Sequence, residues 1–68
     1  MPLVTIKMIE GRTPEQKESA ARAITDILVK HCDAHREHIY VVFEDVADSD
    51  WLVGGVTVRQ RKNERGGS

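Results

Sequence analysis

Cysteine is nearly absent from this 68-residue sequence, which contains only Cys32. A single thiol cannot form a disulfide within the chain, and the cysteine and histidine residues lack the spacing of a structural zinc site. No segment approaches the roughly 20 apolar residues of a membrane-spanning helix. The N-terminus also lacks the charged leader and long apolar stretch of a signal peptide. The sequence therefore predicts a cytoplasmic protein that has no membrane partner.

The chain is also short, with room for one domain and a small core. A folded monomer of this size buries only about 60% of the surface that its unfolded chain exposes. The apolar part of that burial barely offsets the conformational entropy lost on folding. Without a disulfide or a structural metal, association with other copies is the remaining source of stability. We therefore expect a homo-oligomer.

Charge is almost balanced overall, at a formal net charge of −1, but it is unevenly distributed. Residues 1–58 hold six basic and ten acidic residues, whereas residues 59–68 hold four basic and one acidic. A nucleic-acid-binding tail is the alternative for residues 59–68, but they include no aromatic side chain to stack on bases and no long basic run. We interpret residues 1–58 as a single domain and residues 59–68 as a basic, flexible tail, and we expect no nucleic-acid partner.

Two apolar segments predict β-strands. Residues 3–9 alternate in character, with the side chains of Val4, Ile6 and Met8 on one face. Residues 39–44 are almost continuously apolar, which is typical of a strand that is covered on both faces. A helix between two strands makes them parallel, with a right-handed crossover.

Residues 14–32 are predicted to form that helix. Thr13 is a good N-cap, Pro14 suits the first helical position, and Gln16 completes a capping box. The spacing of apolar residues places one face of the helix along Ala20, Ile24, Ile27, Leu28 and His31.

A short hairpin follows, in which residues 51–53 and 56–58 flank Gly54 and Gly55. The predicted fold class is therefore α/β (α+β), a single β-α-β unit with parallel strands and a C-terminal hairpin. One helix covers only one face of a two-stranded sheet. We expect oligomerisation to complete the other face and the edges.

The side chains that usually bind metals or act as nucleophiles give weak signals in this sequence. His31, His35 and His38 would suit a metal only if the helix continued, and the polar composition of residues 33–38 predicts a loop. We interpret all three as surface histidines and expect no metal site. We interpret Cys32 as a buried or half-buried small hydrophobe rather than a catalytic thiol.

Pro2 offers a different chemistry. Removal of Met1 leaves a secondary amine at the start of the chain. A free α-amino group titrates at about 7.7–8.0, and burial or a nearby cation lowers its pKa toward the range of an efficient general base. The alternative is a proline that merely opens an edge strand.

Residues 2–17 read P-L-V-T-I-K-M-I-E-G-R-T-P-E-Q-K, and residues 51–55 read W-L-V-G-G. These segments resemble the 4-oxalocrotonate tautomerase family, whose chains begin with proline, a strand and E-G-R-[ST]-x-E-Q-K. The resemblance continues through the W-x-x-G-G of residues 51–55 of this chain. The resemblance implies a hexameric keto–enol isomerase with active sites at subunit boundaries and no cofactor. It also implies a small anionic substrate, a 2-oxo or 2-hydroxy unsaturated carboxylate.

The resemblance gives roles to three residues of this chain. Pro2 matches the catalytic proline, which moves a proton between oxygen and carbon. Arg12 matches the arginine that binds a substrate carboxylate, for which a permanently charged, bidentate guanidinium is suited. Trp51 lies where the family has phenylalanine in an apolar active-site wall that excludes water.

One family position differs in this chain. Near the start of the second strand the family's prototype has another arginine, which a neighbouring subunit contributes, and Tyr40 occupies that position here. A phenol can donate one hydrogen bond but carries no charge. Arg36, His35 and His38 are close in sequence and could supply part of the missing charge.

Two alternatives to a tautomerase remain open at this stage. A hydratase or dehalogenase-like enzyme would use protonated Pro2 as an acid together with a carboxylate that activates water, for which Glu10, Glu44 and Asp45 are candidates. A non-catalytic oligomeric binding module would keep the fold alone.

Overall fold

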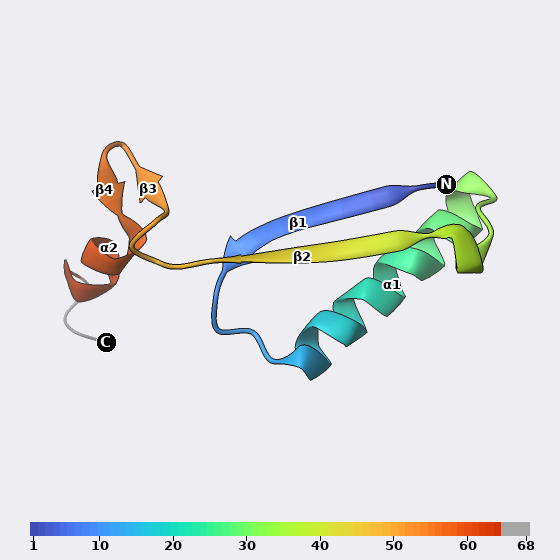
Figure 1. Ribbon diagram of the computed structural model, residues 1–68, viewed down its shortest axis with the longest axis horizontal. Coiled ribbons are helices and arrows are strands. Elements are labelled where there is room, and N and C mark those ends of the chain that lie inside the picture. The colour runs from blue at the N-terminus through green and yellow to red at the C-terminus, as the bar shows by residue number, and fades with distance from the viewer. Residues whose placement is uncertain (65–68) are drawn as a thin grey trace.

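The chain forms a β-α-β unit, then a hairpin and a second short helix. The computed structural model describes residues 1–64. Its elements are β1 (Leu3–Ile9), α1 (Pro14–Cys32), the 3-10 turn η1 (Arg36–His38), β2 (Tyr40–Val46), β3 (Leu52–Val53), β4 (Val56–Thr57) and α2 (Val58–Glu64). β1 and β2 pair in parallel, α1 lies along one of their faces, and β3 and β4 pair antiparallel (Figure 1). The predicted fold class is therefore confirmed.

β1 and β2 run side by side along their whole lengths. Leu3 lies opposite Tyr40 at one end, and Ile9 lies opposite Val46 at the other. β2 therefore begins one residue later, and ends two residues later, than the strand predicted over residues 39–44. In one copy of the chain α1 covers only one face of this sheet.

The unexpected extension of β2 consists of Asp45 and Val46. Asp45 and its predicted strand neighbour Glu44 are acidic, and each lies next to a lysine of another element. Lys7 Nζ is 3.8 Å from Glu44 Oε2, and Lys17 Nζ is 2.7 Å from Asp45 Oδ2. These ion pairs offset the low strand preference of the two carboxylates, and pairing with β1 continues past them.

The start and end of α1 agree with the prediction for residues 14–32. The Thr13 hydroxyl accepts a hydrogen bond from the Gln16 N–H at 3.1 Å, and Gln16 Oε1 accepts one from the Thr13 N–H at 2.9 Å. Asp33 ends the helix in a left-handed conformation with φ of 53°, and aspartate tolerates this conformation better than most residues do. The local sequence therefore determines both ends of the helix.

The face of α1 that packs on the sheet differs in part from the predicted one. Ile24 and Leu28 are half-buried as expected, but Ala20, Ile27 and His31 are exposed. The face that packs on the sheet instead includes Thr25. Because Thr25 is polar, the spacing of apolar residues in the sequence did not indicate it. Its hydroxyl donates to the Ala21 carbonyl oxygen at 2.8 Å, so Thr25 can lie against the sheet without an unsatisfied donor.

Cys32 is exposed, so the prediction of a buried or half-buried thiol is wrong. It occupies the last position of α1.

A tight turn joins β3 to β4. Gly54 and Gly55 have φ of 61° and 83°, and two successive positive values suit the hairpin turn whose twist matches that of its strands. The predicted hairpin is confirmed, although each of its strands has only two residues.

α2 occupies residues that were predicted to be a flexible tail. The Thr57 hydroxyl accepts a hydrogen bond from the Gln60 N–H at 3.1 Å, and Gln60 Oε1 accepts one from the Thr57 N–H at 3.2 Å. This capping box repeats the one at the start of α1, and it explains why a helix begins here. The prediction of a flexible tail from residue 59 is therefore wrong as far as Glu64, and its last four residues lie outside the described ones.

Asp48 connects α2 to the turn after β2. Its carboxylate lies 2.9 Å from Arg59 Nε and 3.5 Å from Lys62 Nζ. Burial acts to raise the pKa of Asp48, but the hydrogen bond from Arg59 and the charges of Arg59 and Lys62 outweigh it and hold the pKa below its ordinary value. Two basic residues of the supposed tail therefore make contacts within the chain.

A single copy of the chain does not enclose a hydrophobic core. Among residues 1–64 no side chain is buried, and the radius of gyration is 15.7 Å, against about 11 Å for a compact chain of this length. The hairpin and α2 stand apart from the layer formed by β1, β2 and α1 (Figure 1). Six apolar or aromatic side chains beyond Met1 remain well exposed: Leu3, Ile27, Tyr40, Val42, Leu52 and Val53.

The exposure of Val42, at 44%, contradicts for a single copy the prediction that β2 is covered on both faces. Within residues 1–64, neither helix has the length and apolar character needed to cross a membrane.

Candidate active site

Pro2 lies at the start of β1, where it is half-buried. Its carbonyl oxygen accepts a hydrogen bond from the Tyr40 N–H at 3.0 Å. This bond fixes the beginning of the chain to the start of β2. Met1 precedes it with 82% of its surface exposed. Removing Met1 would therefore disturb little packing and would leave the Pro2 nitrogen at the end of an anchored strand.

Tyr40 adjoins Pro2 through its backbone, while its side chain lies on the outer face of the sheet. Its partner Leu3 shares that face, because side chains opposite one another in paired strands point the same way. The Tyr40 side chain is 49% exposed, so it is available to a neighbouring molecule.

Arg12 lies at the other end of β1, in the loop that leads to α1. Gly11 makes the turn possible with φ of 123°, a conformation that other residues rarely adopt. Arg12 is exposed, and within residues 1–64 its guanidinium makes no ion pair or side-chain hydrogen bond. A free guanidinium in this position can bind an anion.

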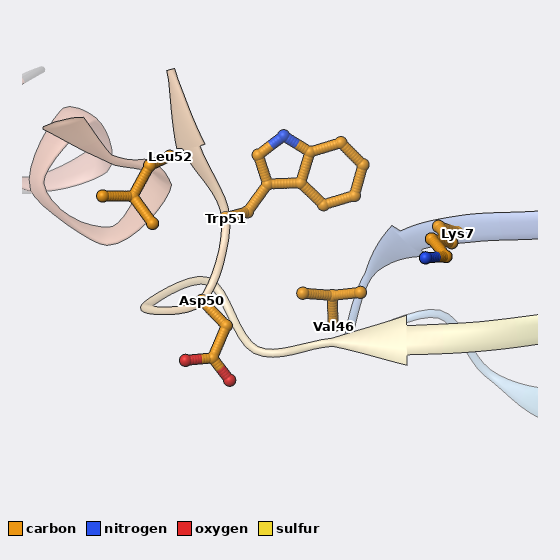
Figure 2. Close-up of a pocket in the computed structure, with 5 residues that line it drawn as sticks. All are labelled: Lys7, Val46, Asp50, Trp51 and Leu52. Carbon is orange, nitrogen blue, oxygen red and sulfur yellow. The ribbon is translucent and has the colours of Figure 1, made fainter. Parts of the chain in front are cut away.

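Trp51 borders a hollow on the surface of the described part of the chain. This hollow is open, has a volume of about 350 Å³ and is lined by Lys7, Val46, Asp50, Trp51 and Leu52. Figure 2 shows the indole of Trp51 extending toward the end of the sheet where Val46 and Lys7 lie, while Asp50 and Leu52 point away from it. The hollow thus combines an aromatic wall, an aliphatic floor and one cation. Only Trp51 of these five was a predicted site residue.

The predicted residues fall into two groups at opposite ends of the sheet. Pro2 and Tyr40 lie where β1 and β2 begin, whereas Arg12 and Trp51 follow the residues where these strands end. Seven strand residues separate the groups by about 20 Å, at roughly 3.3 Å per residue. One copy of the chain therefore does not bring the four residues together.

Two of the three carboxylates that could activate water already have partners. Glu44 lies close to Lys7, and Asp45 is hydrogen-bonded to Lys17. Glu10 is exposed, and no ion pair or side-chain hydrogen bond involves it within the described residues. A carboxylate that is held by a lysine is a poor general base, because the cation stabilises its charged form.

The sequence did not place His35, Arg36 and His38, which lie in and beside η1 at the Pro2 end of the sheet (Figure 1). Only the pairing of β1 with β2 reveals this, since 33 residues separate Pro2 from His35 in the chain. Across residues 1–64 no three histidine, cysteine or acidic side chains gather in a way that could hold a metal ion.

Comparison with known proteins identifies a family to which this chain is similar. The family model described as tautomerase enzyme matches residues 2–61. A probable tautomerase of Listeria monocytogenes is 41% identical over 56 residues, which cover 82% of this chain and 92% of that protein.

Two solved structures have a similar fold. A structure from work on the 4-oxalocrotonate tautomerase isozymes of Methylibium petroleiphilum is 28% identical with a TM-score of 0.87, covering 93% of this chain and 98% of that one. A heterohexamer 4-oxalocrotonate tautomerase from Chloroflexus aurantiacus is 32% identical with a TM-score of 0.82, covering 88% and 97%.

Proposed function

Because the chain belongs to the tautomerase family, we propose that it interconverts the enol and keto forms of a small 2-oxo or 2-hydroxy unsaturated carboxylate. The observation that carries the proposal is the position of Pro2. It starts a strand that is tied to β2 by a 3.0 Å hydrogen bond, and only an exposed methionine precedes it. Loss of Met1 would convert an amide nitrogen, which has no basicity, into a fixed secondary amine.

In the proposed reaction the Pro2 amine takes a proton from the enol hydroxyl and returns a proton to carbon. Arg12 binds the substrate carboxylate, for which its unpaired guanidinium is suited. Trp51 excludes water from the reacting groups. A cation and an apolar wall both lower the pKa of an amine, so they favour the neutral form that acts as a base.

The proposed site requires more than one copy of the chain. The Pro2 end and the Arg12–Trp51 end of one copy are separated by about 20 Å. Two copies related by a two-fold axis, with their β1 strands antiparallel, would bring the Pro2 end of each to the Arg12–Trp51 end of the other. The same arrangement would cover apolar surface that one copy exposes.

The proposed assembly is a homohexamer. The heterohexamer from Chloroflexus supports six subunits as an arrangement that this fold can adopt. The exposed outer face of the sheet, with Leu3, Tyr40 and Val42, supports a further contact beyond the pairing of two copies.

Water addition by a hydratase or dehalogenase-like enzyme has less support than enolisation. That reaction needs a carboxylate to activate water, and two of the three candidates, Glu44 and Asp45, are paired with lysines, which leaves Glu10 alone. Enolisation needs only the amine and groups that bind the substrate.

The test is an ultraviolet assay of phenylpyruvate enol, with the N-terminal mass measured on the same sample. Pro2→Ala should reduce kcat/KM by about a hundredfold or more, the effect of losing a general acid-base group. The control is Ser19→Ala, which changes an exposed residue of α1 that is not part of the proposed site. Full activity in Pro2→Ala, or in a sample that retains Met1, would rule out the proposed role.

A further inference from the structure

Two histidines form a preorganised pair at the end of the sheet where the chain begins. The rings of His35 and His38 meet edge to face, with centroids 5.8 Å apart and planes at 71°. The His38 N–H donates a hydrogen bond to the His35 carbonyl oxygen at 2.9 Å, which sets the spacing of the two residues. Both side chains are exposed, so the pair can bind a small anion without a structural change.

The start of β2 places this pair at the end of the sheet where Pro2 lies. The pairing of β1 with β2 begins at Leu3 and Tyr40, and the Tyr40 N–H donates to the Pro2 carbonyl oxygen at 3.0 Å. His38 ends η1 only two residues before Tyr40. The nitrogen of Pro2 is the atom that joins it to Met1. Removing Met1 would therefore expose the amine at the same end of the sheet as η1, the end at which Figure 1 marks the N-terminus.

Neither of the two other candidates at this end can easily provide a charged contact there. Arg36 is engaged by Asp26 of α1, with Nη2 2.6 Å from Oδ1. The Tyr40 side chain lies on the outer face of the sheet and carries no charge. Of the residues that the sequence offered to supply the missing charge, the two histidines therefore remain free to bind a ligand.

We propose that His35 and His38, when protonated, bind the distal carboxylate of a dicarboxylate substrate beside Pro2. The inference rests on the proposed function and assigns it a specificity determinant. An imidazolium donates two N–H groups and carries the positive charge that Tyr40 lacks. Unlike arginine, imidazole ordinarily changes charge between pH 5 and 8. The preference for dicarboxylates over monocarboxylates should therefore rise as the pH falls.

Other charged and titratable groups surround the pair, and their effects on the pH dependence must be distinguished from those of the pair. They are Asp26, Lys30, His31, Asp33, Arg36 and Glu37. Arg36 and Asp26 form an ion pair with each other, and carboxylic acids and lysine amines in proteins ordinarily change charge outside the range from about pH 5.5 to 8. The Pro2 amine acts on every substrate, so its titration cancels in a ratio of two kcat/KM values. His31 is the remaining imidazole among these residues, and it provides the control.

The experiment measures kcat/KM for 2-hydroxymuconate, a dicarboxylate, and for phenylpyruvate enol, a monocarboxylate, between about pH 5.5 and 8. In the wild type the ratio of dicarboxylate to monocarboxylate should rise about tenfold toward low pH, the difference between a charge-assisted and a neutral hydrogen bond. The double variant His35→Gln/His38→Gln should show a flat ratio with monocarboxylate turnover retained. His31→Gln, on the exposed side of α1, should behave like the wild type.

A ratio that is independent of pH in the wild type, or that still rises in the double variant, would overturn the inference. Failure of the proposed function gives a different result, namely no turnover of either substrate or full activity in Pro2→Ala. In that case, binding of a dicarboxylate measured by NMR tests the role of the pair independently of turnover. Adipate, a six-carbon dicarboxylate, should shift the imidazole signals of His35 and His38 at about pH 6 more than hexanoate does. Equal shifts would refute the role of the pair.

Discussion

Mixed oligomers test the proposal that each active site takes Pro2 from one copy and Arg12 from another. The variants Pro2→Ala and Arg12→Ala should each be nearly inactive alone, because every site in a uniform oligomer lacks one of the two groups. When equal amounts are unfolded together and refolded, half of the two-fold pairs contain one copy of each variant. One of the two sites in such a pair has both native residues, so activity should recover to about 25% of the wild-type value.

The need for two copies follows from the length of β1. A distance of about 20 Å between the two groups is too great for one small carboxylate to contact both within a single chain. The assay is phenylpyruvate enol turnover before and after co-refolding, with each variant refolded alone as the control. Sedimentation at low micromolar concentration checks that all samples are oligomers. If activity does not rise above the mean of the two separate variants, Pro2 and Arg12 do not serve a shared site; a stable, folded monomer would refute the assembly itself.

Three further predictions concern single positions. Tyr40→Arg should raise kcat/KM for 2-hydroxymuconate about tenfold relative to phenylpyruvate enol, since a charge-assisted hydrogen bond exceeds a neutral one by about 1–2 kcal/mol; an unchanged ratio would exclude Tyr40 from the site. Since the pKa of Asp48 lies below its ordinary value of 3.8, its ion pairs stabilise the fold above that value and lose this effect as the pH falls through the lowered pKa. Asp48→Asn should therefore destabilise the protein at pH 7 and not at about pH 2, as measured by denaturant unfolding; an equal loss at both would contradict this linkage. Thr57→Ala should cost about 1 kcal/mol of α2 stability by removing the N-cap, seen as faster amide exchange in α2, whereas Ser19→Ala on the exposed side of α1 should leave exchange in α2 unchanged.

The elements with complete local signals could be predicted from the sequence. Thr13 and Gln16 determine where α1 begins, and two glycines with positive φ determine the hairpin turn. α2 has the same signal at Thr57 and Gln60, but its basic composition obscured it. The prediction of a flexible tail went wrong because Asp48, nine residues before Thr57, provides the partner for that charge.

The candidate site was only partly predictable, for a geometrical reason. Residue types and family resemblance identified Pro2, Arg12, Tyr40 and Trp51, but neither says which of them lie together. That depends on the register between β1 and β2, which sequence patterns do not determine. The register places the predicted residues at two ends of the sheet, and it brings η1 beside Pro2.

If Pro2 acts as proposed, Met1 must be removed, and the exposure of Met1 then bears on the order of events in maturation. An aminopeptidase must reach this residue, and in the free chain it can, because Met1 is 82% exposed at the end of β1. In the proposed assembly a second copy covers this end, so trimming has to precede association. A chain that joined an oligomer with its methionine in place would contribute a blocked site for the lifetime of the particle. The fraction of subunits that lose Met1 before assembly would then determine the specific activity of the finished enzyme.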